Sequence, residues 1–147
     1  MLLQDGRTPP LIPIRITYEG DLHCAAVHGP SGATLATDAP TDNQGKGESF
    51  SPTDLVATAL GTCMLTVMGI AARTHAIDIS GTTATVEKDM ASSSPRRIAR
   101  LGVQIHVPHD LSADNKRRLE AAAHTCPVHK SLHPDTLMPI QFTWGDA

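Results

Sequence analysis

Aromatic residues are scarce in this sequence. One Trp, one Tyr and two Phe make up 3% of 147 residues, whereas 40% of the residues are hydrophobic. A core with so few rings must be built from Ala, Val, Ile, Leu and Met, and alanine-rich helices pack closely. We therefore expect a broad interface between a helix and a sheet, or between two subunits. The length fits one domain with one hydrophobic core, spanning residues 1–147.

A strong excess of charge is also absent. The 12 basic and 15 acidic residues give a net charge of −3, which argues against a nucleic-acid-binding surface. The first ten residues lack the basic region and following apolar run of a signal peptide. We also expect no apolar run long enough to span a membrane. We expect a cytoplasmic protein that binds neither nucleic acid nor membrane.

Cysteine is rare, with three residues at Cys24, Cys63 and Cys126. An odd number of cysteines in a reducing compartment does not suggest a disulfide scaffold, and it leaves room for reactive thiols. Cys24 alternates with the apolar residues Leu22 and Ala26, so we interpret it as a structural residue of a strand.

Apolar periodicity predicts six strands and three helices. The strands are expected at 11–20, 22–28, 33–38, 77–91, 96–110 and around 140–144, and the helices at 51–76, 113–125 and 127–132. The order β-β-β-α-β-β-α-α-β indicates the α+β class, with the first three strands forming an antiparallel meander. The segment 39–49 has no apolar period and reads as a long loop, a kind of segment that is often functional.

The 51–76 segment carries the strongest helix signal. Ser51 suits the N-cap and Pro52 the first helical position. Apolar residues follow on nearly all sides, which predicts a helix that is buried all round and forms the spine of the domain or of a dimer. Gly61 and Gly69 are expected to allow close approach of another backbone.

Two of the cysteines occupy contrasting positions. Cys126 directly precedes Pro127 and is predicted to be the N-cap of a short helix, where backbone N–H groups should lower the pKa of the thiol. Cys63 lies in the middle of the apolar helix. From spacing alone it is either a small buried hydrophobe or a thiol that ionises only if a cation reaches it.

Taken together, two motifs resemble the OsmC/Ohr family of thiol peroxidases. They are SPTDLVATALGTC at 51–63 and CPVHKSL at 126–132. The resemblance implies an α+β fold of antiparallel sheets around a long buried central helix, in an intertwined homodimer. It also implies that Cys63 attacks a small organic hydroperoxide, that Cys126 resolves the resulting sulfenic acid, and that a thiol or dithiol reductant restores both without a cofactor.

Family members usually activate the helix cysteine with an arginine and a carboxylate. Where the organic-hydroperoxide subgroup has a glutamate, this sequence has Thr53, and the next residue, Asp54, is expected to cap the helix. We favour Glu48 as the carboxylate. For the arginine we favour Arg15 over Arg7, although Arg15 reads equally well as an exposed residue of a strand.

Histidines around Cys126 suggest a rival interpretation. His124, His129 and His133 lie close to it in sequence, but a zinc site needs four convergent ligands and no second close pair is present. We therefore expect no metal. His124 or His129 either supplies positive charge to the thiols or packs the helix junction.

The substrate pocket is expected on the side of the helix that carries Cys63. Its predicted lining residues are Val56, Ala59, Leu60, Val67 and Ile70. The alternative function is a non-peroxidatic dimer that binds a small apolar or thiol-reactive ligand in the same pocket.

Overall fold

The computed structural model describes residue 6 and residues 8–146, which fall into two compact units. The first unit ends at Pro52 and the second begins at Thr53, and each is described by itself. The single domain expected from the length stays a prediction. Arg7 lies outside the described residues.

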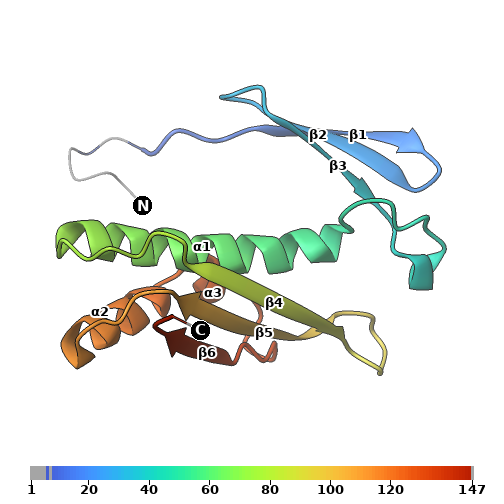
Figure 1. The fold of residues 1–147 in the computed structure, drawn as a ribbon. Coiled ribbons are helices and arrows are strands. Elements are labelled where there is room, and N and C mark those ends of the chain that lie inside the picture. The colour runs from blue at the N-terminus through green and yellow to red at the C-terminus, as the bar shows by residue number, and fades with distance from the viewer. Residues whose placement is uncertain (1–5, 7, 147) are drawn as a thin grey trace. The chain divides into compact units, whose positions relative to one another are not determined.

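The first unit contains a three-stranded antiparallel meander, as predicted (Figure 1). Its strands are β1 (Ile14–Gly20), β2 (His23–His28) and β3 (Thr34–Asp38). Ile16 pairs with Ala26, which pairs in turn with Leu35, so these residues lie on one face of the sheet. Ile16 and Leu35 are 67% and 48% exposed, so the apolar face is open to contact.

The segment after β3 is more ordered than the predicted structureless loop. It contains a short 3₁₀ helix, η1 (Thr41–Asn43), and its two ends are joined by a hydrogen bond of 3.0 Å from the Asp38 amide to the Phe50 carbonyl. At Gly45 a Cβ atom would lie 1.7 Å from the carbonyl oxygen of Ala39, so only glycine fits there. The segment therefore folds back on its own base.

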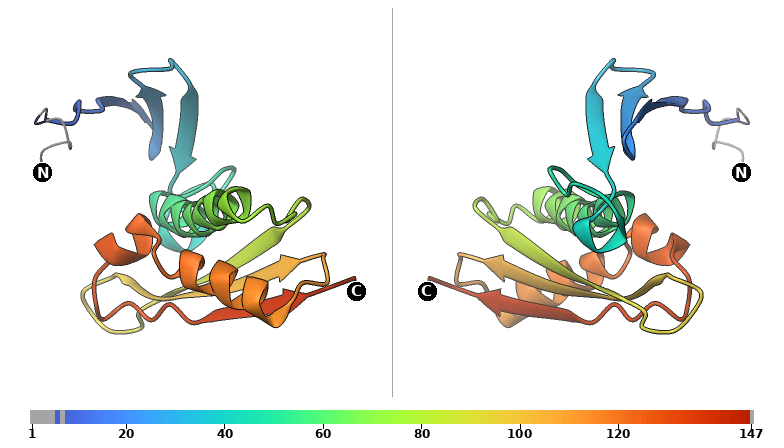
Figure 2. Two further views of the ribbon diagram at one scale, coloured as in Figure 1. Left: turned by 90° about the vertical axis from the view of Figure 1, so that its left-hand side faces the viewer. Right: turned by 90° about the vertical axis from the view of Figure 1, so that its right-hand side faces the viewer.

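The second unit is a three-stranded sheet with all three helices on one face (Figure 2). Its elements are α1 (Pro52–Thr74), β4 (Thr83–Met90), β5 (Ile98–Val107), α2 (Ala113–Ala123), α3 (Pro127–Ser131) and β6 (Ile140–Trp144). β4 pairs with β5 antiparallel, but β6 pairs with β5 parallel, so the expectation of purely antiparallel sheets is wrong. The crossover through α2 and α3 returns the chain in the direction of β5.

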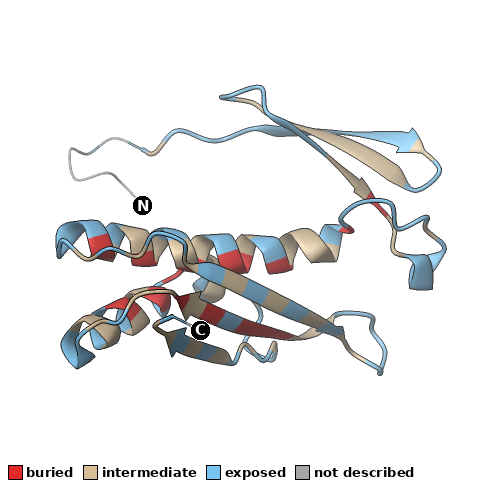
Figure 3. Ribbon diagram, viewed as in Figure 1, coloured by how far each residue is buried: buried red, intermediate tan, exposed pale blue. Residues whose placement is uncertain are grey.

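The core lies between this sheet and the helices (Figure 3). Apolar residues alternate along β5 and form one buried face, on which each is at most 1% exposed. The fully buried apolar residues of the core are Leu60, Met64, Met68, Leu101, Val103, Ile105, Val107, Leu119 and Ala123. Gly61 allows a close approach, since a Cβ there would lie 3.0 Å from Cγ2 of Val86 on β4.

Helix α1 is buried on one side only, so the prediction of burial all round is wrong for the single chain. Thr58, Thr62 and Thr66 form an exposed row at intervals of four residues. Each hydroxyl donates to the carbonyl four residues earlier, at 2.8–2.9 Å. Ile70 continues the row and is 61% exposed. One sheet covers one side of a helix, and these residues lie on the other.

The length of α1 also corrects a sequence prediction. With 23 residues and a mean hydropathy of 1.9 over its most apolar window, it is long and apolar enough to cross a membrane. A helix in the core of a folded domain passes the same test, and 33% of this window is buried inside the unit's own fold. One such helix is therefore weak support for a membrane span.

Candidate active site around two thiols

Cys126 lies at the junction between α2 and α3. It is the N-cap of α3, and Pro127 is the first helical residue, as predicted. The Cys126 sulfur accepts a hydrogen bond from the backbone N–H of His129 at 3.4 Å. The short helix therefore holds this sulfur in one place.

The structure brings Cys126 and Cys63 together. The Cys63 side chain lies near enough to act on the pKa of the Cys126 thiol, although the two residues are 63 positions apart in sequence. Cys126 is fully buried, at 0% exposure, whereas Cys63 is only partly buried against the same core. A molecule that approaches from solvent therefore reaches Cys63 first.

The predicted effect of the cap on the Cys126 thiol is wrong in sign. Burial raises the pKa of Cys126, and the hydrogen bond and charge of the neighbouring Cys63 raise it further. The N–H groups of His129 and Val128 act in the opposite direction but do not prevail. The local sequence shows the cap but not the burial, and burial is the larger effect here. Cys126 is thus a neutral thiol at neutral pH.

His129 adds little positive charge beside Cys126. Burial lowers the pKa of His129, and the nearby Lys130 and His124 lower it further. His129 is therefore neutral at physiological pH, and it contacts Cys126 through its backbone N–H. His124 caps the C-terminus of α2. Within residues 6 and 8–146, no group of three or more His, Cys, Asp or Glu residues is placed to hold a metal ion.

The start of α1 involves a residue that the sequence analysis missed. Lys88 of β4 donates from Nζ to Oδ1 of Asp54 at 2.7 Å and to Oγ1 of Thr53 at 2.8 Å. Its side chain is only 17% exposed. The sequence indicated this burial, because residues two apart in a strand lie on the same face and Lys88 follows Ala84 and Val86 on the inner face of β4. A lysine at such a position needs an anionic partner.

The remaining predicted site residues are exposed residues of the first unit. Arg15 is exposed on β1, opposite Val27, and Glu48 is exposed near the end of the segment that follows β3. Both belong to the first unit, whereas both thiols belong to the second, so their roles toward Cys63 stay predictions.

The predicted pocket residues differ in burial. Leu60 is fully buried and belongs to the core, whereas Ile70 is 61% exposed. Val56 and Val67 are partly buried beside the core. The surroundings of Cys63 on α1 are thus apolar, and the pocket itself stays a prediction.

Comparison with known proteins agrees with the motifs. Residues 45–138 match the family described as OsmC-like protein. A solved structure from Psychrobacter arcticus, described as an osmotic stress induced and detoxification response protein, has 46% sequence identity and a TM-score of 0.85. The similarity covers 92% of this chain and 98% of that chain.

More distant structures share the fold. A Legionella pneumophila organic hydroperoxide resistance protein OsmC is 16% identical, with a TM-score of 0.71 and coverage of 93% and 99% of the two chains. A Vibrio cholerae organic hydroperoxide resistance protein with captopril in one of its active sites is 13% identical, with a TM-score of 0.73 and coverage of 95% of both chains. No curated protein matches this chain.

Proposed function

The chain belongs to the OsmC-like protein family, and from this premise we propose that it is a thiol-dependent peroxidase that reduces organic hydroperoxides. The observation that carries the proposal is that the fold places the Cys63 side chain beside Cys126, near enough to raise the pKa of its thiol. Two neighbouring thiols can form a disulfide without a large rearrangement of the backbone.

In the proposed reaction the Cys63 thiolate attacks the terminal oxygen of a hydroperoxide. The O–O bond breaks, Cys63 becomes a sulfenic acid, and the departing alkoxide takes up a proton to leave as an alcohol. The Cys126 sulfur then attacks the sulfenic sulfur, and water leaves as the disulfide forms. An external dithiol reduces the disulfide, so that one peroxide and two thiol equivalents give one alcohol, one water and one disulfide.

The difference between the two thiols supports this division of roles. The Cys63 sulfur is the more accessible one. The Cys126 sulfur is buried and accepts a hydrogen bond from the His129 amide at 3.4 Å. The raised pKa of Cys126 keeps it protonated while Cys63 reacts. A neutral thiol beside the attacking sulfur can also supply the proton that the alkoxide needs. Val56 and Val67 on the same helix suit an apolar peroxide.

We further propose that the functional form is a homodimer. The exposed row of α1, from Thr58 to Ile70, is suited to contact with a second copy. Because the threonine hydroxyls are satisfied within their own helix, their methyl groups can be buried without loss of hydrogen bonds. The exposed apolar face of β1 to β3, with Ile16 and Leu35, offers a second surface.

Arg15 and Glu48 remain the proposed activating pair. An arginine near Cys63 would favour its thiolate, and a carboxylate would orient the guanidinium by a bidentate contact. The proposed location is the cytoplasm, where thiol reductants are available. The proposed partners are a second copy of the chain, a small organic hydroperoxide and a thiol or dithiol reductant.

A second candidate function is a non-peroxidatic dimer that binds a small apolar or thiol-reactive ligand beside Cys63. The observation that favours it is the V. cholerae protein of the same fold, whose structure holds captopril in an active site. Here Cys63 would be a contact residue and the thiol pair would not turn over.

A peroxidase assay separates the two functions. Cumene hydroperoxide or tert-butyl hydroperoxide is mixed with the protein and a panel of dithiols and monothiols, and peroxide consumption is followed. We expect multiple turnover with at least one dithiol, lost in Cys63→Ser, because serine lacks the nucleophilicity of the thiolate. Cys24→Ser is the matched control and should keep full activity. Equal consumption by wild type and Cys63→Ser would favour the binding function.

A further inference from the structure

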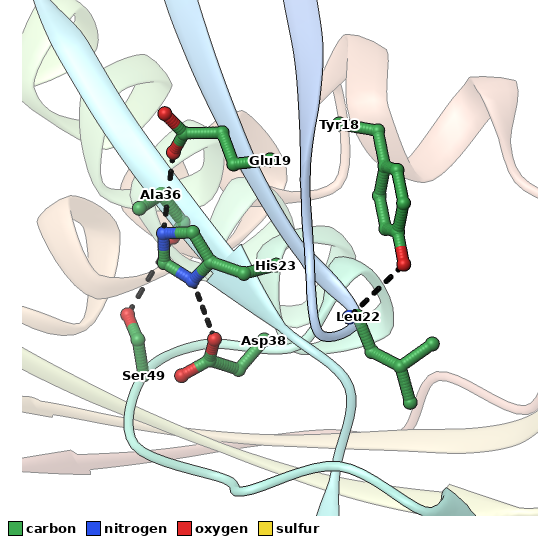
Figure 4. Close-up of polar contacts among 7 residues, drawn as sticks. All are labelled: Tyr18, Glu19, Leu22, His23, Ala36, Asp38 and Ser49. Atoms are coloured by element: carbon green, nitrogen blue, oxygen red, sulfur yellow. Dashed lines mark hydrogen bonds and ion pairs between the residues drawn. The ribbon is translucent and has the colours of Figure 1, made fainter.

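A cluster of charged side chains in the first unit is closed on itself. His23 on β2 is paired in register with Asp38 on β3, and its Nδ1 lies 2.6 Å from Oδ1 of that residue. Its Nε2 lies 3.5 Å from Oε1 of Glu19 on β1 (Figure 4). Asp38 is 7% exposed, so its contact with the ring is largely shielded from water. Both ring nitrogens of His23 thus have a carboxylate partner within the sheet.

The outer face of the sheet in the second unit is different. The three helices lie on the other face, so the side chains that point outward form an open polar surface (Figure 2). On β5 this surface carries Arg100, Gly102 and Gln104, at intervals of two residues. Gly102 is paired in register with Glu87 of β4, and Gln104 with Gln141 of β6. The register therefore gathers two charged groups and two amides on one face.

Gly102 makes room for the guanidinium of Arg100. A Cβ atom at Gly102 would lie 2.6 Å from each terminal nitrogen of Arg100 and 2.8 Å from its Cζ. The guanidinium therefore lies over the glycine, and Gly102 is buried although it belongs to the outer face. A glycine inside a strand weakens the strand and often marks a place where another group approaches closely. Here that group is the guanidinium, which is held against the sheet.

A cavity of about 150 Å³ opens beside this guanidinium, and its lining includes Arg100, Glu87, Gln104 and Gln141. The ion pair that Arg100 makes with Asp89 is 3.5 Å long, and the Asp89 side chain is 64% exposed. Such a long and exposed contact is weak, so the guanidinium donors stay available. The Glu87 side chain forms no hydrogen bond or ion pair with any residue that the structure describes. The cavity thus holds a cation and an anion that do not satisfy each other.

We propose that the cavity lined by Arg100, Glu87, Gln104 and Gln141 binds a small zwitterion of the α-amino acid class. The guanidinium of Arg100 can donate two parallel hydrogen bonds to the carboxylate of the ligand. The carboxylate of Glu87 can accept from the ammonium of the ligand, and the two glutamine amides can donate to one end or accept from the other. A ligand with a single charge would satisfy only one of the two charged groups of the protein.

The test is an NMR titration of the full chain at neutral pH and constant ionic strength, with L-alanine and two matched probes. N-acetyl-L-alanine lacks the ammonium, and L-alaninamide lacks the carboxylate. The backbone amide of Gly102 and the side-chain amides of Gln104 and Gln141 are followed. We expect saturable shifts with alanine in the millimolar range, because the site is on an open face where solvent screens its charges. Each probe should bind about tenfold more weakly or worse, because it lacks one of the two charges.

Variants assign each end of the ligand. Arg100→Gln should weaken alanine binding through the carboxylate, whereas Glu87→Gln should remove the preference for alanine over N-acetyl-alanine. Gly102→Ala should also weaken binding, because its Cβ atom displaces the guanidinium, and the end of the flexible Arg100 side chain can move without disturbing the fold. Arg117→Gln is the matched control. It removes the same charge from α2, on the other face of the sheet, and should leave alanine binding unchanged.

Three results would overturn the proposal. They are the absence of a saturable shift with alanine, equal affinities for alanine and either probe, and wild-type affinity for alanine in Arg100→Gln. The first two use the wild-type chain and do not depend on whether a variant folds. None of these measurements uses peroxide or either thiol of the proposed redox pair. The amino acid site can therefore fail while the peroxidase proposal stands, and the reverse also holds.

Discussion

Replacing Cys126 separates its structural contribution from its proposed chemical one. Its sulfur caps α3 by accepting from the His129 amide at 3.4 Å, and it lies near Cys63, which raises the pKa of its thiol. Serine is a preferred N-cap residue and is close in size, so Cys126→Ser should retain the cap. Cys126→Ala removes it and leaves a partly buried N–H group without its acceptor.

The expected magnitudes differ accordingly. Cys126→Ser should lie within about 1 kcal/mol of wild type in the free energy of unfolding, and Cys126→Ala should lie about 1 kcal/mol below Cys126→Ser. Both variants should complete one turnover per subunit and then stop acting as catalysts. Without the resolving thiol, excess peroxide should carry Cys63 to the sulfinic or sulfonic acid.

Two measurements test this pair of variants. Urea unfolding at fixed protein concentration gives the stabilities, and peroxide consumption with mass spectrometry of the Cys63 peptide gives the chemistry. Sustained turnover in Cys126→Ser would refute the resolving role. If Cys126→Ser keeps turnover and only the less stable Cys126→Ala loses it, Cys126 acts only as a cap.

Further predictions concern α1 and the assembly. Lys88→Met should lower the free energy of unfolding by about 1 kcal/mol, because the Lys88 side chain is mostly shielded and binds both Asp54 and Thr53. Arg117→Met removes an exposed ion pair with Asp114. It should change the free energy of unfolding by less than about 0.5 kcal/mol in the same urea experiment. An equal effect of the two substitutions would contradict the role assigned to Lys88. Sedimentation at micromolar concentration should show a dimer, and Thr62→Glu should weaken it by placing a charge in the exposed row of α1. A wild-type monomer would refute the proposed assembly.

Local signals in the sequence predicted the elements well. Ser112, a residue type typical of the N-cap, caps α2 by accepting from the Asn115 amide at 3.2 Å. Pro52 opens α1 and Pro127 opens α3, each at the first helical position. The alternation in β5 gave its buried face. Caps, prolines and alternation act over a few residues, so a single sequence contains them.

Properties that depend on distant parts of the chain were not predictable in this way. The parallel pairing of β6, the sign of the Cys126 pKa shift and the pairing of His23 with Asp38 all depend on which segments meet in the fold. The exposed side of α1 follows from its single covering sheet, which composition does not show. The motifs at Cys63 and Cys126 were informative because the family resemblance, rather than local periodicity, linked them.

The central claim is that Cys63 and Cys126 form a redox pair, and mapping the disulfide formed by peroxide tests it most directly. The reduced protein is treated with one equivalent of cumene hydroperoxide, alkylated and digested without reductant. The Cys63 and Cys126 peptides should then appear as one disulfide-linked species of a single chain, while Cys24 is alkylated. If the peroxide is not consumed and both Cys63 and Cys126 are recovered as alkylated thiols, the account is contradicted.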